Sequence, residues 1–155
     1  MININKFSMG ATAAIITSLA LIAGLAHGES DKSVIIAGLL IIAIADNITD
    51  SLSIHIYKES EGASKKEIYI STFGNFTIRL ILALTFVLII FLLPSYTALI
   101  VSIIWGAILL AVLSYYVTKS DNKNLIREIV WHLLIAFFVI GGSKLLGDLI
   151  SSKVI

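Results

Sequence analysis

The sequence contains no cysteine and a single proline, Pro94, and only 14% of its 155 residues are charged. Without cysteine, the chain cannot form a disulfide, a thiolate metal site or a cysteine nucleophile. Soluble domains carry about a quarter charged residues, so the low charge argues against a soluble fold. A formal net charge of +1, with no run of basic residues, also offers no surface for nucleic acid.

Apolar residues make up 58% of the chain, its mean hydropathy is +1.01, and these residues form five long runs. A bilayer core of roughly 30 Å needs about 20 mostly apolar residues per helix, and each run meets that length. The runs cover approximately 9–27, 33–57, 68–93, 96–118 and 126–150. We therefore expect a single all-α transmembrane domain, 1–155, with five membrane-spanning helices and short polar loops.

The distribution of lysine and arginine predicts the orientation of these helices, because positive charge gathers in cytoplasmic loops. One side carries Lys6, Lys58, Lys65, Lys66, Lys119, Lys123 and Arg127, and the other carries Lys32 and Lys153. The N-terminus is expected in the cytoplasm. The protein would be a multi-pass membrane protein, placed in the cell membrane if the source is a prokaryote.

The first run also fits a second interpretation. Lys6, an apolar stretch and then Ala26-His27-Gly28 resemble a secretory signal with its cleavage site. However, the apolar stretch is long for a signal peptide. Gly10, Ala14 and Ser18 also share one stripe, which is typical of a membrane helix that packs closely against others. A spanning helix is therefore favoured.

Polar residues within the second run are the main indication of function. Asp46 and Asp50 lie four residues apart on one face of a helix, and Ser53 follows Asp46 on that face after two turns. Asn47 adds an amide oxygen on the adjoining flank. An ionised group near a helix centre costs about 2.5–3.5 kcal/mol on insertion scales, so two aspartates need compensation. An oxygen-rich group of this kind favours a hard or borderline divalent cation.

A charged partner within the membrane is the alternative explanation of these acids. Counted at about 1.5 Å per residue from the cytoplasmic helix ends, Asp46 and Arg79 reach the same depth and are expected to pair. Asp50 lies nearer the cytoplasm, with no lysine or arginine at its level. We therefore expect Asp50 to be the freer metal ligand and Asp46 to be shared between the ion and Arg79.

Three short motifs rich in small residues lie in the first, second and last runs. They are Ala23-Gly24-Leu25-Ala26, then Ile36-Ala37-Gly38-Leu39 with Ala45-Asp46, and finally Gly141-Gly142 followed by Leu146-Gly147-Asp148-Leu149-Ile150. Together they resemble the vacuolar iron transporter family of divalent-metal carriers, over nearly the whole chain. The resemblance implies a homodimer whose first two helices line a path for ferrous iron or manganese, exchanged against protons.

The sequence departs from the family pattern at three places. Ala13 stands where family members carry an aspartate, and Asp50 and Ile54 stand where a methionine and a glutamate are common. The loop after the second run is short and lacks the family's glutamate-rich, metal-gathering insertion. The resemblance therefore transfers Asp46 alone as a family ligand. Replacement of the methionine by Asp50 moves the expected selectivity toward manganese, magnesium or calcium.

Two functions follow from the sequence. The first is a proton-coupled transporter of iron(II) or manganese(II), with metal ions and the lipid bilayer as partners and no bound cofactor. The second is a membrane interaction or assembly protein whose acids serve contacts between helices. Enzymatic activity is not expected, since the sequence offers no intramembrane Ser/His pair, HExxH run or phosphate-binding glycine loop. His132 is expected to anchor at the interface or to bond a neighbouring helix.

Overall fold

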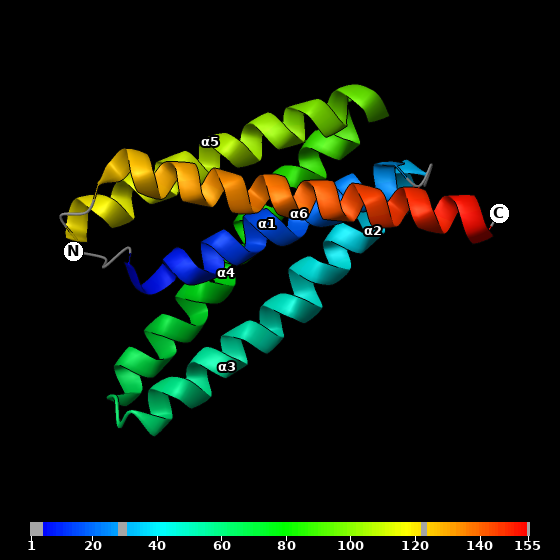
Figure 1. Ribbon diagram of the computed structural model, residues 1–155. Helices are drawn as coiled ribbons and strands as arrows, with labels where there is room; N and C mark the ends of the chain where they lie inside the picture. The colour runs from blue at the N-terminus through cyan, green and yellow to red at the C-terminus, as the bar shows by residue number, and fades with distance from the viewer. Residues whose placement is uncertain (1–4, 28–30, 122–123, 155) are drawn as a thin grey trace.

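The computed structural model describes residues 5–27, 31–121 and 124–154, and within these ranges the chain is helical, with no β-strand (Figure 1). The elements are α1 (Asn5–His27), α2 (Lys32–Ile41), the π-helical turn η1 (Ile42–Asp46), α3 (Asn47–Ser60), α4 (Lys65–Leu92), α5 (Ser95–Asp121) and α6 (Leu125–Val154). Because α2, η1 and α3 follow one another without a break, they form one rod. The five predicted helices are thus present, and each extends beyond at least one of its predicted ends.

Length and composition mark the chain as a multi-pass membrane protein. Within the described ranges, four helical rods are long and apolar enough to cross a membrane: Lys32–Ser60, Lys65–Leu92, Ser95–Thr118 and Leu125–Lys153. The apolar part of α1, Gly10–Ala26, is shorter. Large apolar side chains point outward along the four rods, and Phe138 of α6 is 84% exposed. So extensive an apolar surface suits lipid as its surroundings.

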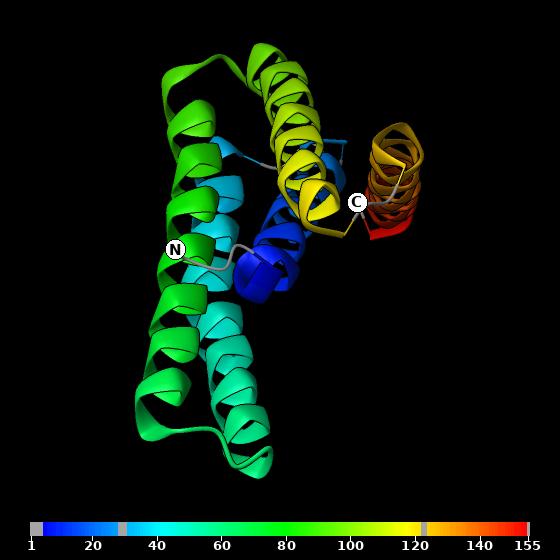
Figure 2. The ribbon, with the colours of Figure 1, turned by 90° about the vertical axis from the view of Figure 1, so that its left-hand side faces the viewer.

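Helix α1 lies at the centre of the bundle and packs against α2, α4, α5 and α6. Figure 2 shows it between the α3–α4 pair on one side and α6 on the other. Its side chains Ile15, Leu19 and Ile22 join Phe86 of α4 and Leu110 of α5 in the hydrophobic core. By contrast, α6 is the least enclosed helix, because Ala136 is its one buried side chain among those described.

Small residues let α6 approach α1 backbone to backbone. A Cβ atom built on Gly147 would lie 2.1 Å from the carbonyl oxygen of Gly24, and one built on Gly24 would lie 3.3 Å from the carbonyl oxygen of Ser143. Close contact of this kind is the usual role of small residues spaced by four in membrane helices. The proposed signal cleavage motif extends into Gly28, which lies outside the described residues.

The π turn keeps one row of side chains buried along the second rod. Residues spaced by four are buried along it: Ile35, Leu39, Ala43, Asn47 and Ser51. In a regular α-helix, a spacing of four drifts by about 40° around the axis at each step. The wider π turn winds more slowly and offsets part of this drift. The sequence predicted a regular helix over 33–57, because no proline marks the irregularity.

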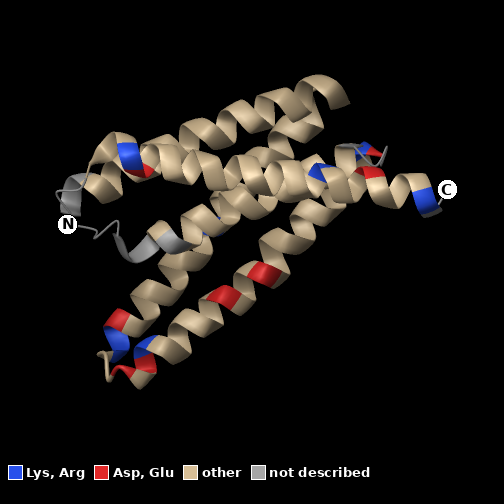
Figure 3. Ribbon diagram, viewed as in Figure 1, with Lys and Arg blue, Asp and Glu red and all other residues tan. Residues whose placement is uncertain are grey.

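Charged residues gather at the ends of the rods, while a pair of acids lies midway along the second rod (Figure 3). At the α3–α4 turn, Gly62 has a φ of 69°, and Ser64 caps α4 by accepting a hydrogen bond from the Glu67 amide at 3.3 Å. At the opposite end of α4, Lys32 donates to the carbonyl oxygen of Phe91 at 2.7 Å. A cation at a helix C-terminus is favourable. Lys123, one of the basic residues that predict the orientation, lies outside the described residues.

Candidate functional site

One arginine of α4 holds both acids of the second rod. Arg79 donates from Nη2 to Asp46 Oδ2 at 2.5 Å, and from Nη1 to Asp50 Oδ2. The Arg79 side chain is 3% exposed, whereas those of Asp46 and Asp50 are 43% and 44% exposed. The structure therefore contains the predicted pairing of Asp46 with Arg79. The prediction that Asp50 has no basic partner is wrong.

The shape of the guanidinium group explains the second contact. Residues four apart on a helix have Cβ atoms about 5–6 Å apart, and arginine presents five N–H donors in a planar fork. One fork can therefore reach carboxylates on two successive turns. The depth of each residue in the membrane was estimated from its Cα position, which leaves out the length and the forked shape of the Arg79 side chain. That estimate therefore predicted only one acidic partner for Arg79.

Two further buried polar contacts near Arg79 join α4 to α1 and α3. Nη1 also donates to the carbonyl oxygen of Gly10, at 3.4 Å. One turn earlier on α4, Asn75 donates from Nδ2 to Ser51 Oγ at 3.3 Å, and both side chains are buried. Sequence reasoning missed Asn75 and Ser51, because uncharged polar residues are ordinary in membrane helices. The spacing of four from Ser71 through Asn75 to Arg79 was the available signal.

Asn47 and Ser53, the other two predicted metal ligands, differ in their surroundings. Asn47 is 1% exposed and donates from Nδ2 to the carbonyl oxygen of Phe76 at 2.8 Å, so its side chain faces α4. Ser53 is exposed and donates its hydroxyl to the carbonyl oxygen of Thr49 at 3.0 Å. Asn47 is therefore turned away from the exposed side of the acid pair, whereas Ser53 remains on the face of Asp46, and the candidate site is centred on two acids anchored by Arg79.

Two carboxylates and one guanidinium leave a net negative charge on this cluster when all three groups are ionised. Each acid uses Oδ2 on Arg79, and neither Oδ1 atom makes a hydrogen bond within the described residues. Such oxygens can accept a hard cation or a proton. The described part of the chain holds no group of three or more His, Cys, Asp or Glu side chains placed for a metal. A bound cation would therefore need further oxygen ligands, which hydroxyl or carbonyl groups, water or a second copy can supply.

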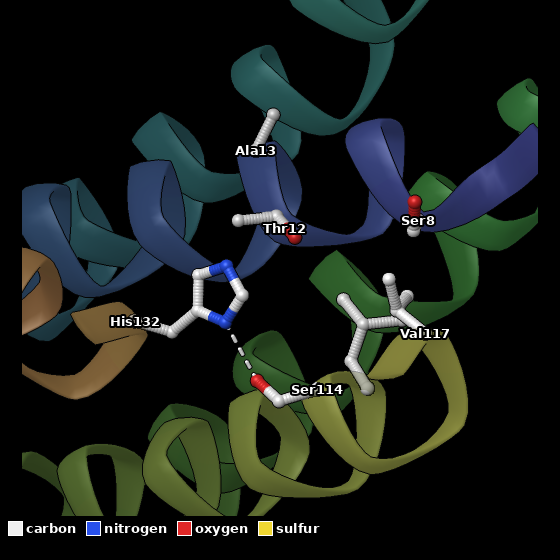
Figure 4. A pocket seen from close by; sticks show the side chains of 7 residues that line it. Ser8, Thr12, Ala13, Ser114, Val117 and His132 are labelled. Carbon is white, nitrogen blue, oxygen red and sulfur yellow. Dashed lines mark hydrogen bonds between the residues drawn. The ribbon is translucent and has the colours of Figure 1, made fainter. Parts of the chain in front are cut away.

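A cavity of about 400 Å³ lies between α1, α5 and α6. Figure 4 shows residues that line it: Ser8, Thr12, Ala13, Ser114, Val117 and His132. His132 Nδ1 lies 2.7 Å from Ser114 Oγ, and that hydroxyl donates to the carbonyl oxygen of Leu110 at 2.7 Å. Because a hydroxyl has one proton, Nδ1 is then the donor to Ser114. The predicted bond from His132 to a neighbouring helix is confirmed.

No family model, curated protein or solved structure matches this chain. The likeness to vacuolar iron transporters consequently rests on the short motifs of the sequence. A fold alone does not determine a function, and function has to be argued from the chemistry of a site. The candidate site for such chemistry is the cluster of Asp46, Asp50 and Arg79.

Proposed function

We propose that the protein is a membrane transporter of divalent cations, iron(II) or manganese(II), with Asp46 and Asp50 as its ion-binding pair. The observation that carries this proposal is the unequal charge of the cluster, in which two half-exposed carboxylates share one buried guanidinium. A structural ion pair needs only one acid. Since a second intramembrane acid costs about 2.5–3.5 kcal/mol on insertion scales, a mobile cation or proton accounts for its presence.

The chemistry of the pair favours hard and borderline cations. Carboxylate oxygens suit manganese, magnesium and calcium, whereas copper(I) prefers sulfur ligands. The chain has no cysteine and two methionines, Met1 and Met9, both near its N-terminus. When the metal leaves, a proton can neutralise the same carboxylate, and this supports exchange of metal against protons.

We further propose five membrane crossings, a cytoplasmic N-terminus and a homodimer. The acid pair is half exposed, and Ser53, which follows Asp46 on the same face of the rod after two turns, is exposed as well. A twofold copy against this face would bring two acid pairs to one axis and supply additional oxygen ligands. Lysines around the α3–α4 turn, Lys58, Lys65 and Lys66, support the orientation and a place in the cell membrane of a prokaryote.

One observation favours a second function. Both carboxylates already contact the guanidinium of Arg79 in the same chain, so the cluster joins the second rod to α4. Polar contacts between membrane helices stabilise association. On this alternative, the acids serve assembly, and the protein is a non-transporting membrane interaction protein.

Uptake by reconstituted proteoliposomes distinguishes the two functions. Manganese, iron(II), magnesium, calcium and copper(I) would be offered singly, with a proton gradient of either direction, and empty liposomes would serve as the control. The transporter should accumulate manganese or iron(II), with a rate that depends on the proton gradient, and should exclude copper(I). Absence of uptake for every metal, together with an unchanged melting temperature in their presence, would favour the assembly function.

A further inference from the structure

A small cavity touches Arg79 where α1, α4 and the second rod meet. Its volume is about 10 Å³, close to the lower limit of space for a single water molecule. Ser18 of α1, Asn47 of α3 and Arg79 of α4 line it, together with the apolar residues Ala43 and Ala83. Three polar side chains from three helices therefore converge on a space of one-water size.

Each of these polar side chains brings an atom that lacks a hydrogen-bond partner within the described residues. The atoms are Ser18 Oγ, Asn47 Oδ1 and Arg79 Nε. The three residues are 0%, 1% and 3% exposed, so bulk water does not reach them. A buried polar atom without a partner costs about 1–3 kcal/mol. Three such atoms around one cavity indicate a shared ligand.

We propose that the cavity binds one internal water molecule that links α1, α3 and α4. Arg79 Nε–H donates to the water oxygen, and the two water protons are donated to Asn47 Oδ1 and Ser18 Oγ. The Asn47 amide cannot take the opposite orientation, because its Nδ2 donates to the carbonyl oxygen of Phe76 at 2.8 Å. Buried waters typically make about three hydrogen bonds, which is the number available in this cavity.

The donor and acceptor character of the lining excludes other small ligands. Arg79 Nε–H can only donate, and Asn47 Oδ1 can only accept. A metal ion would face the guanidinium N–H and be repelled by its positive charge. An anion would face the amide oxygen, close to a cluster with net negative charge. Water both donates and accepts, so it satisfies all three atoms.

The bound water makes Arg79 a fixed group. Its guanidinium is held by the acids at Nη1 and Nη2, and by the water at Nε. The π turn borders the same cavity through Ala43. We therefore assign the water a positioning role for Arg79, and this role does not depend on transport.

Arginine side-chain NMR tests the proposal directly. The sequence has two arginines, Arg79 and Arg127, so Arg127→Lys assigns their Nε–H resonances in detergent micelles. Arg79 Nε–H should show a cross-peak to water whose sign differs between laboratory-frame and rotating-frame experiments. That difference marks dipolar contact with a long-lived water instead of proton exchange. Exposed Arg127 should show exchange with bulk water, and absence of the Arg79 cross-peak would overturn the proposal.

A cavity-filling variant locates the water. Ala83→Val adds two methyl groups at the cavity and should abolish the cross-peak. Ala136→Val on α6 is the matched control, since Ala83 and Ala136 are 3% and 5% exposed, and its cross-peak should persist. If Ala83→Val does not fold, Ser18→Ala removes one water partner without adding volume and should weaken the cross-peak. An unchanged cross-peak in either test variant would refute this site.

Discussion

Asn75 Oδ1 lies so close to Gly10 that a Cβ atom built on Gly10 would stand 1.8 Å from it. The same Cβ would stand 2.9 Å from Asn75 Cγ and 3.3 Å from Arg79 Cδ. Helices α1 and α4 therefore meet at a residue without a side chain. The space that a larger residue would fill is occupied by the side chains of Asn75 and Arg79.

Gly10→Ala should destabilise the protein in detergent by about 1–3 kcal/mol, the usual range for overpacking. The added methyl group forces Asn75 away from Ser51, and this breaks their hydrogen bond. Gly142→Ala is the matched control and should be neutral or slightly stabilising, because nothing lies within 4 Å of the added Cβ. Thermal unfolding measures both. Adding Asn75→Ala to Gly10→Ala should recover part of the loss, and wild-type stability of Gly10→Ala itself would contradict the contact.

The sharing of Arg79 predicts that substitutions of the two acids are strongly non-additive. Either Asp46→Asn or Asp50→Asn leaves the guanidinium with one carboxylate. The double variant leaves a buried charge unpaired and should cost about 3–5 kcal/mol, with each single variant costing much less than half of that. Denaturant unfolding of the four proteins in this cycle measures the coupling. Additive losses would show that the two contacts are independent.

The proposed transport function predicts that Asp50→Asn abolishes metal uptake with little change in stability. Asp50→Asn should fold like the wild type, while manganese uptake falls to the level of empty liposomes, because one ion-binding carboxylate is lost. Ser53→Ala should keep most of the uptake, because it removes no charge from the ion-binding pair, and the lost hydroxyl donates its proton to the carbonyl oxygen of Thr49. Normal uptake by Asp50→Asn would remove the main support for transport.

The contact of α6 with α1 should depend on Gly147. An added Cβ would meet the backbone of Gly24, which cannot rotate away as a side chain would. Gly147→Ala should therefore displace α6 and lower stability by about 1–3 kcal/mol. Gly141→Ala, six residues earlier in open space, should not. Equal melting temperatures for these two variants would show that α6 is not held at this point.

A pH effect is expected at the α3–α4 turn. Glu61 accepts hydrogen bonds from Lys58 Nζ at 2.6 Å and from the Tyr57 hydroxyl at 2.7 Å. The bond from Lys58, followed by that from Tyr57, holds the pKa of the Glu61 carboxyl below its ordinary value. The stabilisation is therefore present above the ordinary pKa and is lost as pH falls through the lowered one. Carbon-13 NMR should show a higher Glu61 midpoint in Lys58→Gln, and an unchanged midpoint would argue against the contact.

The helices were predictable from the sequence, because a bilayer fixes both the length and the composition of a crossing segment. The equal depth of Asp46 and Arg79 in their helices also predicted that these two residues pair. The rest of the site depends on which helix covers each flank of the second rod. Asn47 follows Asp46 at about 100° around the helix, and only the packing of α4 on that flank turns it inward. Likewise, the meeting of Gly10 with Asn75 depends on the relative register of two helices, which periodicity does not supply.

The π turn also makes the second rod tolerant of a change in chain length. If Ile44 or Ala45 is deleted from the π turn, the turn can close as an ordinary α-helical turn. The buried row then has spacings of four, four, three and four, which keep it on one face of an α-helix. The same deletion between Asn75 and Arg79 would rotate the two halves of α4 by about 100° against each other and carry the guanidinium away from the acids. Natural variants with one residue fewer would therefore be tolerated in the π turn of the second rod and selected against between Asn75 and Arg79 of α4.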